Sequence, residues 1–172
     1  MIGLPESAEA APYYFTYIHR VTNPDIAREL ESQLEPSLAF FSRISEEKSL
    51  YRYAPEKWTI REVLSHVTDT ERVFAYRALW FARRFHDALS SFDQNIAVAG
   101  AQADRLPWPA HVEEFRRVRL ATISLFRNLP EEAWMRSGVA SGNKVTVRAL
   151  AFIIAGHLAH HVAILHEKYG VA

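Results

Sequence analysis

The chain has 172 residues, of which 49% are hydrophobic and 23% charged, a composition typical of a globular protein with a sizeable core. Lysine plus arginine and aspartate plus glutamate number 20 each, so the formal net charge is +0 and binding to nucleic acid, which needs basic groups to neutralise phosphates, is disfavoured. The absence of cysteine excludes disulfides, thiolate metal ligands and a cysteine nucleophile, and it agrees with a cytoplasmic location.

No linker, repeat or low-complexity tract divides the chain, so residues 1–172 are expected to form one domain. The first residues lack a basic region followed by an apolar run, and no signal peptide is expected. The most apolar stretch, residues 149–165, carries three histidines, which a helix in contact with lipid rarely tolerates. We therefore expect a buried core helix there and no membrane association.

The first helical pattern begins near residue 23, where Pro24 suits the first position of a helix, and continues toward residue 44. Its apolar face comprises Ile26, Leu30, Leu34, Leu38 and Phe41. Pro36 lies inside this pattern and is expected to kink or split the helix, because proline has no N–H group and its ring clashes with the preceding turn.

The second helix has the clearest start signal in the sequence. Thr59 and Glu62 have the spacing of a capping box, in which each side chain accepts a hydrogen bond from the other residue's backbone amide. Trp58 and Val63 have the spacing of the hydrophobic staple that accompanies such a start. This helix is expected to begin after Thr59 and to continue to about residue 84.

The helical pattern is interrupted between residues 86 and 109, and a connection of this length inside a compact protein is often functional. A third helix is expected over residues 109–128, and a turn or short hairpin over residues 137–144. The apolar side of the third helix comprises Val112, Phe115, Val118, Ile123 and Leu125. The fourth helix is expected to begin at Thr146 and to end at Tyr169, before Gly170. These elements predict an all-α protein.

Three of the eight histidines, His157, His160 and His161, fall within five residues of the fourth helix. Side chains four apart on a helix lie about 5–6 Å from one another, so His157 and His161 can bind one ion, and His157 and His160 meet the requirement almost as well. One candidate inward face comprises Leu150, Ile154, His157, His161 and Leu165. The other comprises Leu150, Ile153, His157, His160 and Ile164. The periodicity alone does not choose between them.

His66 is the candidate third ligand, because it lies one turn beyond Val63 on the second helix, and ligands in helical bundles project from facing helices. Three neutral imidazoles around a divalent ion leave positions open for water or substrate, as in catalytic sites. The alternative is that these histidines only pack in the core. The four remaining histidines are interpreted as surface or packing residues: His19, His86, His111 and His166.

Two segments carry a resemblance to a known family. Residues 53–66 read YAPEKWTIREVLSH, and residues 156–165 read GHLAHHVAIL. In this order and spacing they resemble the DinB-like superfamily of bacterial metalloproteins, which includes YfiT-like metal-dependent hydrolases and thiol S-transferases. The likeness extends over about residues 23–169 and includes Phe92 and Asp93 in the long connection.

The resemblance implies a four-helix bundle with long, right-handed crossover connections, often assembled as a homodimer. It also implies that His66, His157 and His161 hold one divalent metal ion, usually zinc or nickel, and that His160 is an additional histidine outside the ligand set. The family name refers to DNA damage, but the composition gives no support for DNA binding.

A metal ion held by three neutral histidines keeps its full positive charge, and it can lower the pKa of a bound water to about 7 or deprotonate a bound thiol. Since the chain has no cysteine, the thiol must come from a small cosubstrate. Of the two routes, the resemblance to the DinB-like superfamily favours a metal-dependent transferase that activates a low-molecular-weight thiol for attack on an electrophile. A metal-dependent hydrolase and a non-catalytic metal- or small-molecule-binding module in a stress response are the alternatives.

Several other polar residues are further candidates for the site. Asp69 either orients a ligand or pairs with Arg72 on the surface, and Asp93 is a candidate lining residue of the site. Arg77 or Arg148 is a candidate for holding a substrate carboxylate, and either can equally belong to a solvated face. His160 is either a base near the ligands or a core residue.

Overall fold

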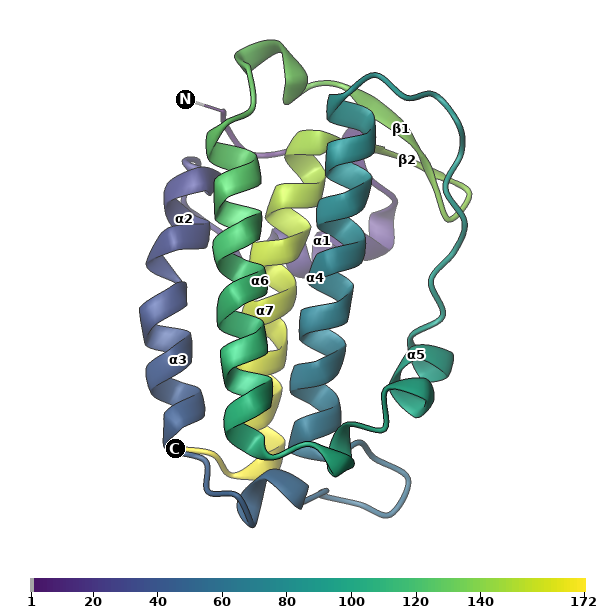
Figure 1. The fold of residues 1–172 in the computed structure, drawn as a ribbon. Helices are drawn as coiled ribbons and strands as arrows, with labels where there is room; N and C mark the ends of the chain where they lie inside the picture. Colours follow the sequence, from purple (N-terminus) through teal and green to yellow (C-terminus); the bar gives the residue numbers. More distant parts are fainter. Residues whose placement is uncertain (1) are drawn as a thin grey trace.

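The computed structural model describes residues 2–172, and its main feature is a four-helix bundle, which confirms the expected fold class (Figure 1). Three long helices, α4 (Ile60–Ala82), α6 (Trp108–Arg127) and α7 (Val147–Tyr169), form the bundle with the broken pair α2 (Ile26–Ser32) and α3 (Leu34–Ser42). Smaller elements are α1 (Phe15–Ile18), α5 (Gln94–Ala101), β1 (Ser137–Ala140), β2 (Asn143–Thr146) and the 3-10 turns η1 (Ser7–Glu9), η2 (Pro12–Tyr14), η3 (Lys48–Leu50), η4 (Ala103–Arg105) and η5 (Glu131–Ala133).

The first bundle helix begins later than predicted. The Asp25 side chain accepts a hydrogen bond from the Arg28 amide (3.2 Å) and caps α2, so Pro24 lies outside the helix and its assignment to the first helical position was wrong. The expected split occurs at Gln33, between α2 and α3. The break lies about one turn before Pro36, where the proline ring would meet the carbonyl of the preceding turn.

The predicted starts of α4 and α7 are confirmed. Thr59 Oγ1 accepts from the Glu62 amide (3.1 Å), and the Glu62 carboxylate accepts from the Thr59 amide (2.8 Å). α4 ends at Ala82, two residues before its expected end. Thr146 caps α7 by accepting from the Ala149 amide, and Gly170, with a φ of 64°, ends that helix.

The connection between α4 and α6 contains a helix that the sequence analysis did not predict. The Asp93 carboxylate accepts hydrogen bonds from the Asn95 and Ile96 amides and starts α5, which lies beside α4 (Figure 1). The hairpin expected over residues 137–144 is present as the antiparallel pair β1–β2 and extends to Thr146, so it leads directly into α7.

The N-terminal segment forms α1, also not predicted, and packs on α7. Gly156 allows this close approach, because a Cβ atom at that position would lie 2.1 Å from the Tyr17 carbonyl oxygen. α1 therefore rests on α7 immediately before His157.

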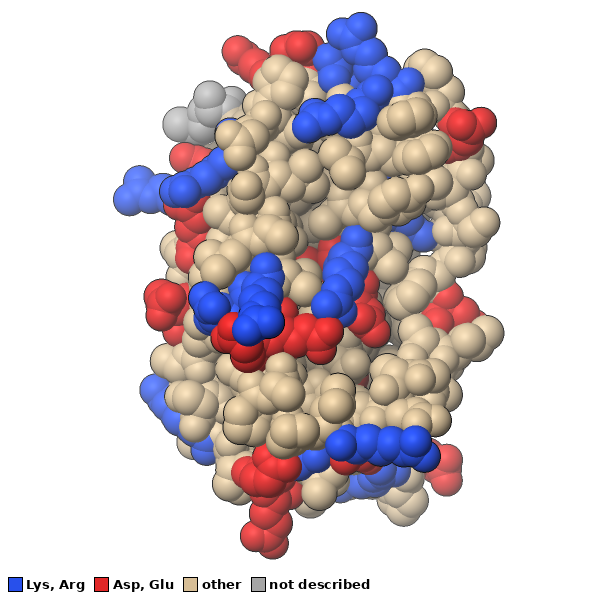
Figure 2. Space-filling model, in the orientation of Figure 1, with Lys and Arg blue, Asp and Glu red and all other residues tan. Residues whose placement is uncertain are grey.

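α7 is the central helix of the core. It is long and apolar enough to cross a membrane by composition, yet every residue from Ala149 to Leu158 is buried, including Leu150, Phe152, Ile153 and Ile154. As expected, it is a buried core helix. Figure 2 shows acidic and basic side chains next to one another across the middle of one face of the molecule. Ion pairs of this kind occur on α6, where Glu113 pairs with Arg116 and Arg117.

Candidate metal centre

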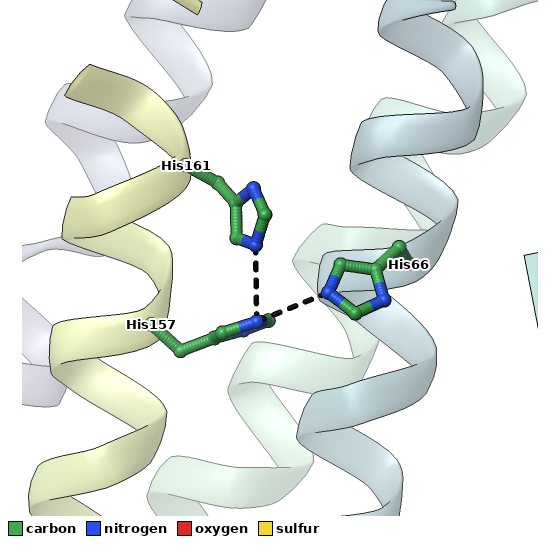
Figure 3. Close-up of side chains that lie close together, drawn as sticks. All are labelled: His66, His157 and His161. Atoms are coloured by element: carbon green, nitrogen blue, oxygen red, sulfur yellow. Dashed lines mark hydrogen bonds between the residues drawn. The ribbon is translucent and has the colours of Figure 1, made fainter. Parts of the chain in front are cut away.

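The three histidines singled out in the sequence lie together in the interior, with His66 on α4 facing His157 and His161 on α7 (Figure 3). Only 4%, 5% and 8% of their respective surfaces are exposed. His157 is central: its Nε2 atom lies 3.1 Å from the Nε2 atoms of both His66 and His161. One nitrogen from each ring lies within 4.8 Å of the other two, an arrangement that could hold a metal ion.

The face of α7 that carries the cluster is the one with His161. Leu150, Ile154, His157, His161 and Leu165 are all buried, whereas His160 and Ile164 are only partly buried. His160 packs against the Tyr17 ring, with 5.3 Å between ring centroids, and is not part of the cluster of converging nitrogens. This arrangement agrees with the assignment of His160 outside the ligand set.

The contacts at His157 are not satisfied by hydrogen bonds alone. A neutral imidazole Nε2 carries either one proton or one lone pair, so the His157 Nε2 atom can form a hydrogen bond with only one of its two neighbours. Two nitrogens bound to a tetrahedral zinc ion at 2.0–2.1 Å would be roughly 3.3 Å apart, close to the separation found here. The donor set and its spacing therefore fit a shared divalent ion.

The protonation state of the imidazoles also suits metal binding. Burial lowers the pKa of His66 to about 4 and that of His161 to about 3, and nearby imidazoles add to the effect at His161. Burial and the adjacent His161 and His66 rings hold the pKa of His157 well below its ordinary value. The three rings are thus neutral at pH 7, the form in which histidine binds metals.

Among residues 2–172, the metal-ligand atoms of the cluster come from the three histidines and from no carboxylate. Thr70 Oγ1 lies 3.3 Å from His66 Nδ1, so a proton on Nδ1 can be donated to this hydroxyl and Nε2 is left free as a ligand. Glu71, a buried carboxylate on the same helix, accepts two hydrogen bonds of 2.8 Å from Arg119 and is committed to that pair. A bound cation would therefore keep its full charge.

A pocket of about 370 Å³ extends from His66 and His157 toward the hairpin, within the usual size range for small-molecule sites. Its walls come from the N-terminal segment, α4, the start of α5 and the β1–β2 turn. Lining residues include Tyr13, Tyr17, Thr70, Phe74, Arg77 and Asp93. The cluster thus has access to a partly apolar space large enough for a small substrate.

Comparison with known proteins assigns the family. The model of the DinB superfamily matches residues 29–165, most of the chain, including all three histidines of the cluster. The chain belongs to the DinB superfamily. A search of the curated proteins gave no match for this DinB protein.

Two solved structures share the fold of this DinB protein. One is YfiT from Bacillus subtilis, described as a probable metal-dependent hydrolase with an unusual four-helix bundle topology; the TM-score is 0.71 at 15% identity, covering 95% of this chain and 90% of the other. The second is a mycothiol-dependent maleylpyruvate isomerase, with a TM-score of 0.72 at 14% identity, covering 90% of this chain and 63% of the other. At these identities the likeness concerns the fold.

The structure separates the remaining polar candidates in this DinB protein. Asp69 pairs with Arg72 on the surface (2.9 Å), which is the simpler of its two interpretations. Asp93 lines the pocket, although its carboxylate also caps α5. Arg148 lies outside the pocket and pairs with Glu9, whereas Arg77 lines it. The residues of the pocket wall that were not predicted include Tyr13, Tyr14 and Tyr17, whose segment shows no long periodic pattern.

Acidification is expected to destabilise the metal-free DinB protein between about pH 6.5 and pH 4. The unfolded chain protonates these histidines near pH 6.5, while the folded protein keeps them neutral to about pH 4 or below, so stability falls as pH falls through this window. The slope is roughly 1.4 kcal/mol per pH unit for each histidine that stays neutral. Urea denaturation at pH 7.5 and at pH 5.5 measures this change in the free energy of unfolding. His161→Gln should reduce the slope and His166→Gln, at an exposed position, should not; equal slopes in both variants would contradict this account.

Proposed function

We propose that this DinB protein is a metal-dependent transferase, in which one divalent ion held by His66, His157 and His161 activates a small thiol for attack on an electrophile. The observation that carries the proposal is the convergence of three neutral, buried imidazoles, with no carboxylate among them, at the inner end of a pocket. Zinc or nickel is the expected ion, since imidazole suits both. We also expect a homodimer in the cytoplasm.

The chemistry follows from the charge of the site. A divalent ion with only neutral ligands supplies, when bound, a thiolate from a coordinated thiol or a hydroxide from a coordinated water at neutral pH. Because the chain lacks cysteine, the thiol has to be a second substrate. The protein's part is to keep the three imidazoles unprotonated and oriented, and Thr70 contributes by accepting from His66 Nδ1.

The pocket wall provides a place for the electrophile next to the imidazoles. The Tyr17 ring packs edge-on against His157, with 5.2 Å between centroids, and Phe74 lies 6.4 Å from the same ring. The Tyr13 and Tyr17 hydroxyls are 2.7 Å apart, and burial together with this contact raises the pKa of Tyr17 above its ordinary value, so it stays protonated. These rings limit water access to the thiol and offer apolar contact to an organic substrate.

The names of the two structural relatives support different branches of this chemistry. The mycothiol-dependent maleylpyruvate isomerase depends on a small thiol, which favours the transferase. YfiT is described as a probable metal-dependent hydrolase, which keeps hydrolysis as the second candidate function. The thiol branch takes precedence here because the pocket beside His157 is walled by aromatic rings and can hold an organic electrophile.

The test compares metal-loaded and metal-free protein in the conjugation of small thiols to a chromogenic aryl halide. Zinc- or nickel-loaded protein should accelerate thiol consumption roughly tenfold or more at pH 7, since a free thiol with a pKa near 8.5 is only a few per cent thiolate. The His157→Ala/His161→Ala variant should give the uncatalysed rate. Equal rates with and without metal across a panel of thiols would refute the transferase, and metal-dependent cleavage of activated esters without thiol would establish the hydrolase instead.

A further inference from the structure

The pocket contains a buried positive charge that the metal chemistry does not use. Arg77 lies eleven residues after His66 on α4, which is three helical turns, so both side chains are on the same face of the helix and line the same pocket. Only 4% of the Arg77 surface is exposed. An arginine this deeply buried ordinarily faces a carboxylate, since an uncompensated buried charge is costly.

Arg77 differs in this respect from the other buried arginines. Arg61 pairs with Glu46, and Arg119 forms two hydrogen bonds with Glu71. Within residues 2–172, no carboxylate lies within ion-pair distance of Arg77, although Asp93 lines the same pocket. Asp93 is engaged with the amides at the start of α5. The charge of Arg77 is therefore available to a bound molecule.

The guanidinium is held in place while part of it stays free. Arg77 Nη2 donates to the Ser90 carbonyl and to Ser141 Oγ, each at 3.0 Å, which fixes it between the long connection and the hairpin. In the part of the chain that the structure describes, Nε and Nη1 have no acceptor. A preorganised guanidinium with free N–H groups is suited to an anionic oxygen, because charge-assisted hydrogen bonds of this kind are the strong ones.

The distance to the histidine cluster limits the size of the molecule. The Phe74 ring centroid lies 6.4 Å from the His157 ring and 5.7 Å from the Arg77 guanidinium carbon. The distance between the Arg77 guanidinium carbon and the centroid of the His157 ring is therefore at most the sum of these two distances. One small organic molecule can span this interval, with its anionic group at Arg77 and its other end at the cluster.

We propose that Arg77 is a specificity-determining residue that binds the carboxylate of a small organic acid in this pocket. That this acid takes part in thiol transfer rests on the proposed function, whereas the anion site itself does not. The carboxylate belongs either to the electrophile or to the thiol cosubstrate. In both cases the pocket selects an acidic molecule over its neutral analogue.

The direct test measures carboxylate binding to the metal-free protein, with two-dimensional amide NMR of the 19.7 kDa chain as the readout. Propionate and succinate should shift resonances around Phe74, Arg77 and Ser141, and neutral propionamide should not. Arg77→Gln should weaken succinate binding about tenfold or more, consistent with the loss of a charge-assisted contact. Arg77→Lys should retain part of the affinity, because the positive charge remains.

Arg72→Gln is the matched control, since Arg72 lies on the same helix but is exposed and paired with Asp69 and Glu114. It should bind succinate like the wild type, and thermal melting should show that both glutamine variants are folded. Shifts of equal size with propionamide, or unchanged succinate affinity in a folded Arg77→Gln variant, would overturn the proposal.

The source of the carboxylate is resolved with metal-loaded protein. If the electrophile carries it, Arg77→Gln raises the KM for an acidic electrophile but leaves the KM for the thiol unchanged; if the thiol carries it, the pattern is reversed. Succinate binding without any thiol chemistry would therefore refute the proposed function and leave the anion site standing, and thiol chemistry without succinate binding would do the opposite.

Discussion

Replacing both His157 and His161 with alanine is expected to abolish the binding of one divalent ion per chain. The wild-type site offers one ring nitrogen from each of three histidines, all within 4.8 Å of one another, and the variant keeps only that of His66. The loss of affinity should be on the order of 10³-fold or more, since disturbing a single outer partner of a metal ligand already costs 10–100-fold. Elemental analysis of the purified, untagged protein measures the stoichiometry before and after reconstitution with zinc or nickel.

His160→Ala is the control for this experiment, because His160 lies on the same helix but outside the converging set. It should retain the ion, and His161→Ala alone should weaken binding. Absence of metal in the wild type after reconstitution with either ion would show that the histidines are only core residues. Loss of metal in His160→Ala with retention in His161→Ala would show that the other face of α7 carries the site.

The largest effect on folding is expected from the buried ion pair between α4 and α6. Arg119 is fully buried, Glu71 is 3% exposed, and their two hydrogen bonds are both 2.8 Å. Glu71→Gln would leave the guanidinium charge without a compensating anion, and breaking such a pair typically costs about 3–5 kcal/mol. The free energy of unfolding from urea denaturation measures the loss.

Two further variants separate this effect from general damage to α4 and α6. Glu114→Gln removes an exposed partner of Arg72 and should change the free energy of unfolding by less than about 1 kcal/mol. The double variant Glu71→Leu/Arg119→Met removes both charges and should be more stable than Glu71→Gln, because apolar replacements of a buried pair are often tolerated. If Glu71→Gln and Glu114→Gln cost the same, the pair does not stabilise the bundle.

The parts of the fold that the sequence predicted correctly depend on local signals. Thr59 and Glu62, three residues apart, accept hydrogen bonds from each other's backbone amides at the start of α4. Thr146 and Gly170 are the capping residues at the two ends of α7. α1 and α5 were missed because they are short, with four and eight residues, and neither repeats its apolar spacing over several turns. The side chain of Asp93, which caps α5, was a feature of the sequence from which the start of this helix could have been predicted.

The site was predictable in its residues but not in its surroundings. The four-residue spacing of His157 and His161 is a local property, whereas the choice between His161 and His160 depends on how α7 is rotated toward α4. The pairing of charges depends on residues that lie even farther apart in the sequence. Nothing near Arg77 or Arg119 in the sequence indicates that Arg119 meets Glu71, 48 residues away, while Arg77 meets no carboxylate among the described residues.

The contact at Gly156 has a consequence for how such proteins diversify. The family match starts at residue 29, but Tyr13, Tyr14 and Tyr17, which line the pocket, precede it, and the Tyr17 backbone approaches α7 at that glycine. The three imidazoles lie within the matched residues, and part of the pocket wall comes from the segment that precedes them. Exchanging this segment between relatives would therefore change which molecules are accepted while leaving the ligand geometry in place, provided that position 156 keeps no side chain.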